Sequence, residues 1–199
     1  MKNLFNHKSL KVMLWVLGLT VILFGSGLVS RIAFLFHQED VEAKLKEIHE
    51  AKISLADITG ENMPSFTGSK SKDTVEGIDE NNNGIRDDVE LSILNAYPDL
   101  VTRAQLMQYA FALQTMANTK YVNEDIATAV IQEKSRAYEC LASHLPKDTE
   151  NILEISDELA QFVEKLQLNT PARIKADDNF YKKIGSFNQT QKEFCDLKI

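Results

Sequence analysis

The sequence contains few of the residues that interrupt helices. Among its 199 residues there are only eight glycines and four prolines, while 44% of the residues are hydrophobic and 26% are charged. A chain of this length has room for one core of ordinary size, and its apolar content is too high for general disorder. Scarce glycine and proline favour helices over strands and turns. We therefore expect an all-α fold.

The familiar catalytic motifs are also absent. The sequence has no C-x-x-C, H-E-x-x-H, G-x-S-x-G, P-loop or dinucleotide-type glycine pattern, so the chemistries that these motifs support have no basis here. We predict no catalytic residue and no cofactor-binding residue, and we do not expect an enzyme. The histidines are scattered, and the tyrosines lie near expected helix faces, where they either line a groove or pack in the core: His7, His37, His49, His144; Tyr97, Tyr109, Tyr121, Tyr138, Tyr181.

Acidic residues are missing from the first 37 positions, which carry three lysines and one arginine. Since the formal net charge of the whole chain is −7, the remainder carries −11. An acidic body of this kind repels phosphate backbones and anionic lipid headgroups. Nucleic acid is therefore a poor candidate partner, and cations and basic proteins are better ones.

One long stretch, Val12 to Ser30, has no charged residue. It is about as long as the roughly 20 residues that cross a bilayer as a helix, and nothing else in the chain is apolar enough to enclose it as a core helix. We interpret residues 12–36 as a transmembrane anchor. Because lysines precede this span and acids such as Glu39 follow it, the positive-inside rule places residues 1–11 in the cytoplasm and exports the rest.

A cleaved signal peptide is the alternative, with Val12 to Phe24 as its apolar region and Gly25 and Gly27 as the small residues before the cut. Against cleavage, apolar sequence resumes at residues 31–36, and no clear A-x-A-like site is present. No cysteine lies near the end of the run, which argues against a lipoprotein. We expect a single-pass protein of the bacterial inner membrane whose C-terminal domain is periplasmic or extracellular. The alternative is a protein secreted after cleavage.

Three regions follow the anchor. Residues 37–56 carry a narrow apolar stripe that predicts a juxtamembrane helix; only about two heptads of pairing are visible, so dimerisation remains open. Residues 57–77 are polar and show no period, which favours a flexible linker. Residues 78–199 show successive amphipathic stretches, which predict a small helical bundle. Its helices are expected over 88–97, 99–118, 123–145, 148–168 and 172–186, with a short one at the C-terminus.

The start of this helical domain reads D-E-N-N-N-G-I-R-D-D-V-E from Asp79 to Glu90. An EF-hand-type calcium loop places side-chain oxygens at positions 1, 3, 5, 9 and 12, a glycine at 6 and a backbone carbonyl at 7. Each of these positions holds a permitted residue. Such a loop wraps the ion in hard oxygen ligands before the following helix presents a carboxylate. The candidate ligands are Asp79, Asn81, Asn83, Ile85 through its carbonyl, Asp87 directly or through water, and Glu90.

This stretch resembles the calcium-binding loops of the EF-hand and dockerin class, and more closely a D-x-D-x-x-G-x-R-D-D-V variant of exported bacterial proteins of uncharacterised function. The resemblance is limited to residues 79–90 and implies the same ligand set. It departs from the class because no good entering helix precedes the loop, position 8 is Arg86, and no second loop occurs. A single loop implies a structural calcium ion rather than a cooperative sensor, and magnesium fits less well. A plain polar turn is the alternative, since Asn-Gly favours turns.

The only two cysteines are Cys140 and Cys195. In an oxidising exported compartment two thiols commonly pair, and a bridge that closes a loop of this length contributes about 4 kcal/mol in the chain-entropy model. We predict a disulfide between them. Two buried free thiols are the alternative.

These features together predict a membrane-anchored exported helical module with a structural calcium site, acting through contacts with a protein partner at the bacterial envelope. The alternatives are a small exported hydrolase or a ligand-binding sensor domain with an unrecognised site. An enzyme would show a cleft in which acids, tyrosines or His144 converge with perturbed pKa values.

Overall fold

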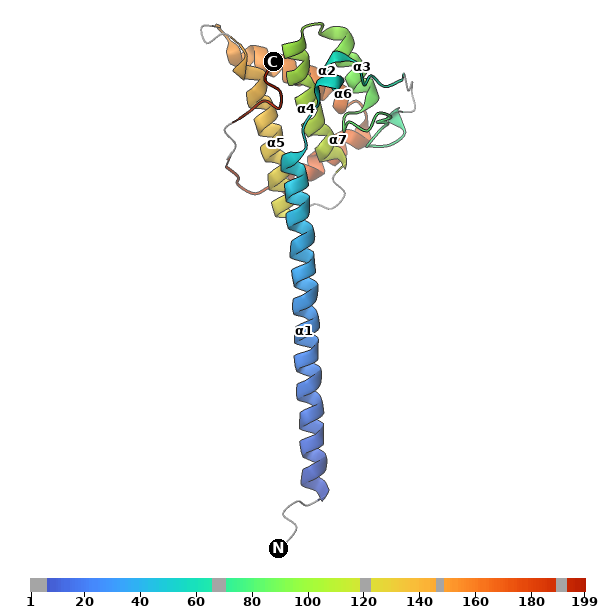
Figure 1. The fold of residues 1–199 in the computed structure, drawn as a ribbon, viewed down its shortest axis with the longest axis vertical. Coiled ribbons are helices and arrows are strands. Elements are labelled where there is room, and N and C mark those ends of the chain that lie inside the picture. Colours follow the sequence, from blue (N-terminus) through green and yellow to red (C-terminus); the bar gives the residue numbers. More distant parts are fainter. Residues whose placement is uncertain (1–6, 66–70, 119–122, 146–148, 189–192) are drawn as a thin grey trace. The chain divides into compact units, whose positions relative to one another are not determined.

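The computed structural model describes residues 7–65, 71–118, 123–145, 149–188 and 193–199. These residues form helices and no strand, so the expected all-α fold is confirmed (Figure 1). The α-helices are α1 (His7–Glu50), α2 (Leu55–Thr59), α3 (Asp87–Ala96), α4 (Leu100–Asn118), α5 (Glu124–Ser143), α6 (Ile152–Gln167) and α7 (Pro171–Tyr181).

The expected anchor and most of the expected juxtamembrane helix lie in one uninterrupted helix, α1 (Figure 1). The juxtamembrane helix was expected over residues 37–56, but α1 ends at Glu50, residues 51–54 are not helical, and residues 55–56 belong to α2. No glycine or proline lies between Gly27 and Gly60, so nothing in the sequence breaks the helix near residue 37. Its segment Met13–Ile32 is 20 residues long, exposed, and apolar enough to cross a membrane by length and composition.

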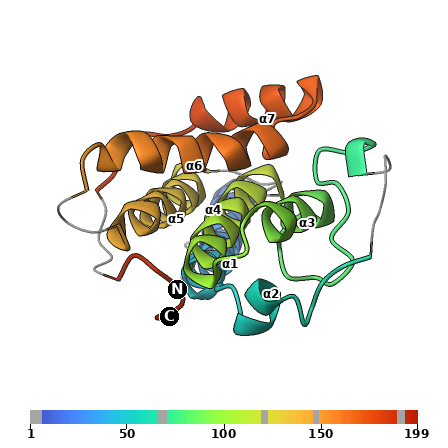
Figure 2. The ribbon, with the colours of Figure 1, turned by 90° about the horizontal axis from the view of Figure 1, so that it is seen from above.

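The chain divides into two compact units, Met1–Lys44 and Leu45–Ile199. In the second unit α4 is the central helix: α2, α3, α5, α6 and α7 all contact it (Figure 2). Residues 104–110 of α4 are buried without interruption, because neighbours cover every face of the helix. Aliphatic side chains dominate the core, including Ile85, Ile93, Leu106, Met107 and Val130, each with 0% of its surface exposed. Burial of each such side chain contributes roughly 1.5–3 kcal/mol.

Several helix boundaries follow from capping and breaking residues. The side chain of Asn123 accepts a hydrogen bond from the backbone N–H of Ile126 at 2.8 Å, which caps the start of α5. Helix α3 ends at Ala96, shortly before Pro98, because proline cannot continue the helical hydrogen bonds. The short C-terminal helix that we expected does not form over residues 193–199.

Parts of residues 57–77, which we expected to form a flexible linker, pack on the bundle. They begin within α2, where the side chain of Ile58 is completely buried. Farther along, the guanidinium of Arg173 donates a hydrogen bond to the carbonyl oxygen of Thr74 at 3.0 Å, so α7 holds this segment on the bundle. The compact unit consequently begins at Leu45, well before the expected domain start. Polar composition suggested a solvated linker, but buried side chains satisfy part of its backbone.

The predicted disulfide between Cys140 of α5 and Cys195 is present, with Cα atoms 5.0 Å apart and a sequence separation of 55. Next to it, Asp196 forms an ion pair with Arg136 at 2.7 Å and accepts a hydrogen bond from the backbone N–H of Ile53 at 3.2 Å. The bridge and these contacts fix the C-terminal segment to α5 and to the residues that follow α1.

Candidate metal site

The loop of residues 79–90 curls around the side chain of Asp79. Its Oδ1 accepts a hydrogen bond from the backbone N–H of Asn83 at 3.1 Å, and its Oδ2 accepts one from the backbone N–H of Gly84 at 2.9 Å. Gly84 has φ = +81°, a left-handed conformation that glycine adopts without strain. The ring of Phe111 lies where a Cβ on Gly84 would stand. Both facts require glycine at the sixth position of the loop.

Ile85, whose carbonyl is an expected ligand, has its side chain completely buried in the core. Its backbone N–H donates to Oδ1 of Asn83 at 2.9 Å. The seventh position of the loop is therefore fastened to the hydrophobic core, and only its backbone is available to the interior of the loop.

The first turn of α3 carries two carboxyl groups into the interior. Asp87 and Glu90 both have 0% of their surface exposed. Oδ1 of Asp87 accepts a hydrogen bond from the backbone N–H of Glu80 at 2.9 Å. Oδ2 of Asp87 is buried and has no hydrogen-bond partner among the described residues. An unsatisfied buried polar atom costs about 1–3 kcal/mol, and more when it is charged. This oxygen is therefore suited to a cation.

Burial disfavours the charged forms of these two groups. It raises the pKa of Glu90 to about 7. The negative charges of Asp57 and Asp87 also raise this pKa, whereas the hydrogen bond from Asn81 lowers it. Burial also raises the pKa of Asp87, which feels the negative charge of Asp79 as well. Among the described residues, no ion pair involves any of these four acids. The cluster is acidic, and all of its members except the half-buried Asp79 are buried. No cationic side chain among the described residues pairs with it.

The fourth acid, Asp57 of α2, was not among the predicted ligands. It is 4% exposed, and its Oδ1 accepts hydrogen bonds from Nδ2 of Asn62 at 2.9 Å and Nδ2 of Asn83 at 3.3 Å. Its Oδ2 accepts one from the backbone N–H of Ser54 at 2.9 Å, which completes the capping box of α2. Burial opposes ionisation of Asp57, but these hydrogen bonds outweigh it and hold its pKa below the usual range. The S-x-x-D pattern at 54–57 signals a cap, and nothing in the sequence links it to the loop.

The residues present fit a hard cation. Asn81 turns its Nδ2 toward Glu90, with 3.1 Å between Nδ2 and Oε2, and Asn83 turns its Nδ2 toward Asp57. The amide N–H groups thus place partial positive charge beside the carboxylates of Glu90 and Asp57. Rotation of the Asn81 amide would turn its oxygen, in place of its N–H group, toward an ion. Among the described residues no three of the carboxyl groups lie within 4.8 Å of one another. Binding therefore requires the side chains to move closer together.

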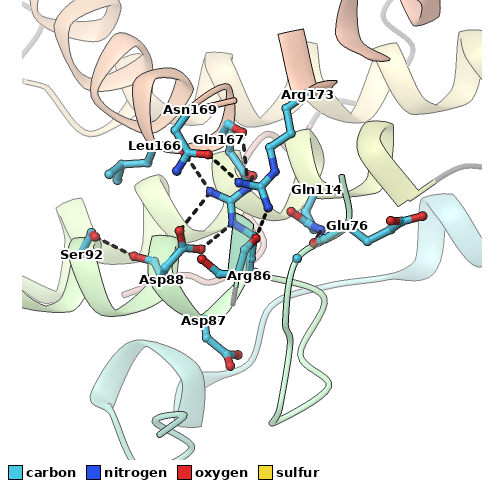
Figure 3. A network of polar contacts seen from close by, with 12 residues as sticks. Glu76, Arg86, Asp87, Asp88, Ser92, Gln114, Leu166, Gln167, Asn169 and Arg173 are labelled. Atoms are coloured by element: carbon cyan, nitrogen blue, oxygen red, sulfur yellow. Dashed lines mark hydrogen bonds and ion pairs between the residues drawn. The ribbon is translucent and has the colours of Figure 1, made fainter. Parts of the chain in front are cut away.

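Position 8 of the loop is a fully buried arginine that ties the loop to the end of α6 (Figure 3). The guanidinium of Arg86 pairs with Asp88 and donates to the carbonyl oxygens of Leu166 at 2.6 Å and Gln167 at 3.3 Å. The last carbonyls of a helix have no donor within the helix, so Arg86 caps α6 with a charge that also suits its dipole. Asp87 points away from this network (Figure 3). The adjacent acids Asp87 and Asp88 therefore serve different partners.

A second buried arginine, Arg173 of α7, lies beside Arg86 (Figure 3). Burial and the nearby charge of Arg86 both lower its pKa. It donates to the carbonyl oxygens of Ser71 and Thr74. Through these two arginines, α6 and α7 hold both the loop and the segment before it, which gives the candidate site a rigid outer side.

Another group of potential metal ligands lies at the disulfide. Cys140, His144 and Cys195 form the one group of three or more His, Cys, Asp and Glu side chains in the described part of the chain whose ligand atoms lie within 4.8 Å of one another. Because the two sulfurs are bonded to each other, neither is available as a thiolate, which is the form of cysteine that ligates metals. His49 does not belong to this group: its Nδ1 lies 2.7 Å from Oε1 of Glu133. The side chain of His37 lies outside the described residues.

Comparison of the chain with protein-family models, with curated proteins and with solved structures gives no match. The resemblance to EF-hand and dockerin loops therefore rests on residues 79–90 alone. What the protein does has to follow from the chemistry of its own side chains.

Proposed function

We propose that the protein is an exported, membrane-anchored helical module in which the loop 79–90, together with Asp57, binds a structural calcium ion. The main support is Oδ2 of Asp87, a buried carboxylate oxygen without a hydrogen-bond partner among the described residues. It lies in a cluster that also contains the buried Glu90. Buried charge is costly unless it is paired or coordinates a metal, and a divalent cation would balance the whole cluster.

The donor types favour calcium over other ions. The candidate ligands are all oxygens, which excludes the soft or nitrogen-rich sites preferred by zinc and copper. Calcium accepts about six to eight oxygens in flexible geometry, whereas magnesium requires a tight octahedron and retains several waters. The proposed set is Asp57, Asp79, Asn81, Asn83, the carbonyl of Ile85, Asp87 and Glu90.

The ion would act as a clamp. It would join α2, the loop and the first turn of α3, while Arg86 joins the same loop to α6. This would fix the surface of the module for contact with another protein at the bacterial envelope, and the acidic character of the chain favours a basic partner. The segment Met13–Ile32 would serve as the anchor, with a cleaved signal peptide as the alternative.

Calorimetric titration of the full chain in a non-ionic detergent with calcium chloride tests the site. We expect saturable binding that Glu90→Gln weakens by at least about tenfold, because the variant keeps the shape and removes a ligand charge. Glu154→Gln, which alters an exposed acid of α6, should bind calcium like the unaltered chain. Equal calcium heats in the unaltered chain and in Glu90→Gln would contradict the site. Equal affinity for magnesium would contradict the choice of ion.

A further inference from the structure

A separate cleft of about 450 Å³ lies between α4, α5 and α6 and is bordered by Tyr181 and Phe187. Three of the tyrosines noted in the sequence converge on it: Tyr109, Tyr138 and Tyr181. Tyr109 is buried at its base, and Tyr181 and Phe187 are partly exposed at its edge. The polar side chains of the cleft are Lys134, Ser135, Asp157, Gln161 and Glu164.

The inner wall of this cleft already holds one cation, the ammonium group of Lys134. Its Nζ lies 5.8 Å from the ring centroid of Tyr109 and 5.4 Å from that of Tyr181. It donates to the hydroxyl of Tyr181 at 2.7 Å and pairs with Glu164 at 3.4 Å. Aromatic faces and a carboxylate are the groups that stabilise an organic cation. The charge of Lys134 is balanced by Glu164, which weakens its attraction for an anion.

Asp157 supplies a second carboxylate in the cleft. It lies seven residues before Glu164 on the same face of α6, roughly 10 Å along the helix axis. The hydroxyl of Tyr138 donates to its Oδ1, and none of the ion pairs among the described residues includes Asp157. This end of the cleft therefore carries an unbalanced negative charge beside Tyr138, and Phe187 lines the same cleft.

The protonation of the lining residues favours binding over catalysis. Burial, with the hydrogen bond to Glu164, raises the pKa of Tyr109, and the hydrogen bond to Asp157 raises that of Tyr138 to about 12. Burial lowers the pKa of Lys134, but its contacts with Tyr181 and Glu164 outweigh burial and raise it. These groups keep their protons at neutral pH, so none of the three is an activated nucleophile or base.

We propose that this cleft binds a small organic cation, an ammonium or guanidinium compound, whose charge lies at Asp157 and whose apolar part packs against Tyr138 and Phe187. The cleft is large enough for a small metabolite, and about half of its lining residues are aromatic or apolar. This proposal does not depend on calcium binding, because none of its residues belongs to the loop 79–90.

Titration of the full chain in detergent with choline and with agmatine tests the proposal, since these probes carry a quaternary ammonium and a guanidinium group. We expect at least one of them to bind. For choline, the matched probe is 3,3-dimethyl-1-butanol, which has the same shape and no charge. Binding that depends on the cation should fall by at least about tenfold with the neutral probe. This comparison uses the unaltered chain and so does not depend on the folding of a variant.

Asp157→Asn provides the second test. Asp157 is exposed, so the variant should fold, and we expect it to weaken binding of the cationic probe by at least about tenfold. Glu158→Gln, the adjacent exposed acid outside the cleft, is the matched control and should bind normally. Three results would each overturn the proposal: no binding of either cation, equal binding of choline and its neutral analogue, or unchanged affinity in Asp157→Asn.

Discussion

Oδ1 of Asp57 accepts a hydrogen bond from Nδ2 of Asn83 at 3.3 Å, although the two residues are 26 positions apart. The contact places α2 against the candidate calcium loop. A loop alone would offer the three carboxylates of Asp79, Asp87 and Glu90, and Asp57 adds a fourth. The number of charged ligands is one determinant of calcium affinity, so Asp57 makes α2 part of the proposed site.

Replacement of Asp57 should therefore weaken calcium binding as clearly as replacement of a loop residue. We expect Asp57→Asn to lower the calcium affinity of the full chain by about tenfold, because it removes a charge from the site while preserving the shape of the side chain. Calorimetric titration measures this change. Glu61→Gln, an exposed acid four residues away, is the control and should leave the affinity unchanged. If Asp57→Asn binds calcium like the unaltered chain, Asp57 only caps α2.

The contrast between Asp57 and the loop shows what the sequence could predict. The ligands of residues 79–90 lie at fixed spacings, so a local pattern is enough to identify them as candidates, and local signals such as Asn123 also predict helix ends. Asp57 reaches the loop only through the packing of α2 on α4, which no local pattern contains. The same holds for Arg86, whose partners Leu166 and Gln167 belong to a helix about 80 residues later.

The metal-free protein should lose stability as the pH rises through the titration range of Glu90. Its pKa is about 7 in the folded state, against an ordinary value of 4.5. The folded state therefore binds more protons than the unfolded state in this window, and the free energy of unfolding falls as the pH rises. The whole shift corresponds to roughly 3 kcal/mol, most of which is lost between pH 5 and pH 8. Urea unfolding at pH 5 and pH 8 in metal-free buffer measures it.

Glu90→Gln is the control for this pH dependence, because its amide does not titrate. The variant should lose less stability than the unaltered chain between the two pH values. Calcium added at pH 8 should restore the unaltered chain and have little effect on the variant. An identical pH dependence in both chains would contradict the assignment to Glu90.

Removal of the Arg86 guanidinium should destabilise the bundle, because it leaves Asp88 and the last carbonyls of α6 without their partner. We expect Arg86→Met, which keeps much of the side-chain volume, to lower the free energy of unfolding by about 3–5 kcal/mol, the range for breaking a buried ion pair. Urea denaturation measures the loss. Lys175→Met removes an exposed cation of α7 and should change stability by less than about 0.5 kcal/mol. Similar stability of the two variants would show that the Arg86 network contributes little.

Reduction of the disulfide should destabilise the second unit. The bridge between Cys140 and Cys195 closes a long loop, and such bridges contribute about 2–4 kcal/mol. We expect the double variant Cys140→Ser, Cys195→Ser to unfold at a lower temperature than the unaltered chain. Dithiothreitol should lower the unfolding temperature of the unaltered chain only. Mass spectrometry without reductant identifies the bridge directly, and two free thiols in protein purified without reductant would refute it.

The segment Met13–Ile32 should hold the chain in a membrane. We expect the full-length mass to be retained, and the protein to stay with membranes during alkaline carbonate extraction, because a hydrophobic span of this length is inserted rather than adsorbed. Leu17→Arg places a charge within the span, at a cost of up to about 3 kcal/mol at the bilayer centre, and should release part of the protein. Leu153→Arg makes the same change at an exposed site of α6 and should not. A mature chain that starts just beyond Gly27 would instead identify the segment as a cleaved signal peptide. The apolar residues 28–36 that would remain after this cut are too few, and contain a charge, to cross a bilayer.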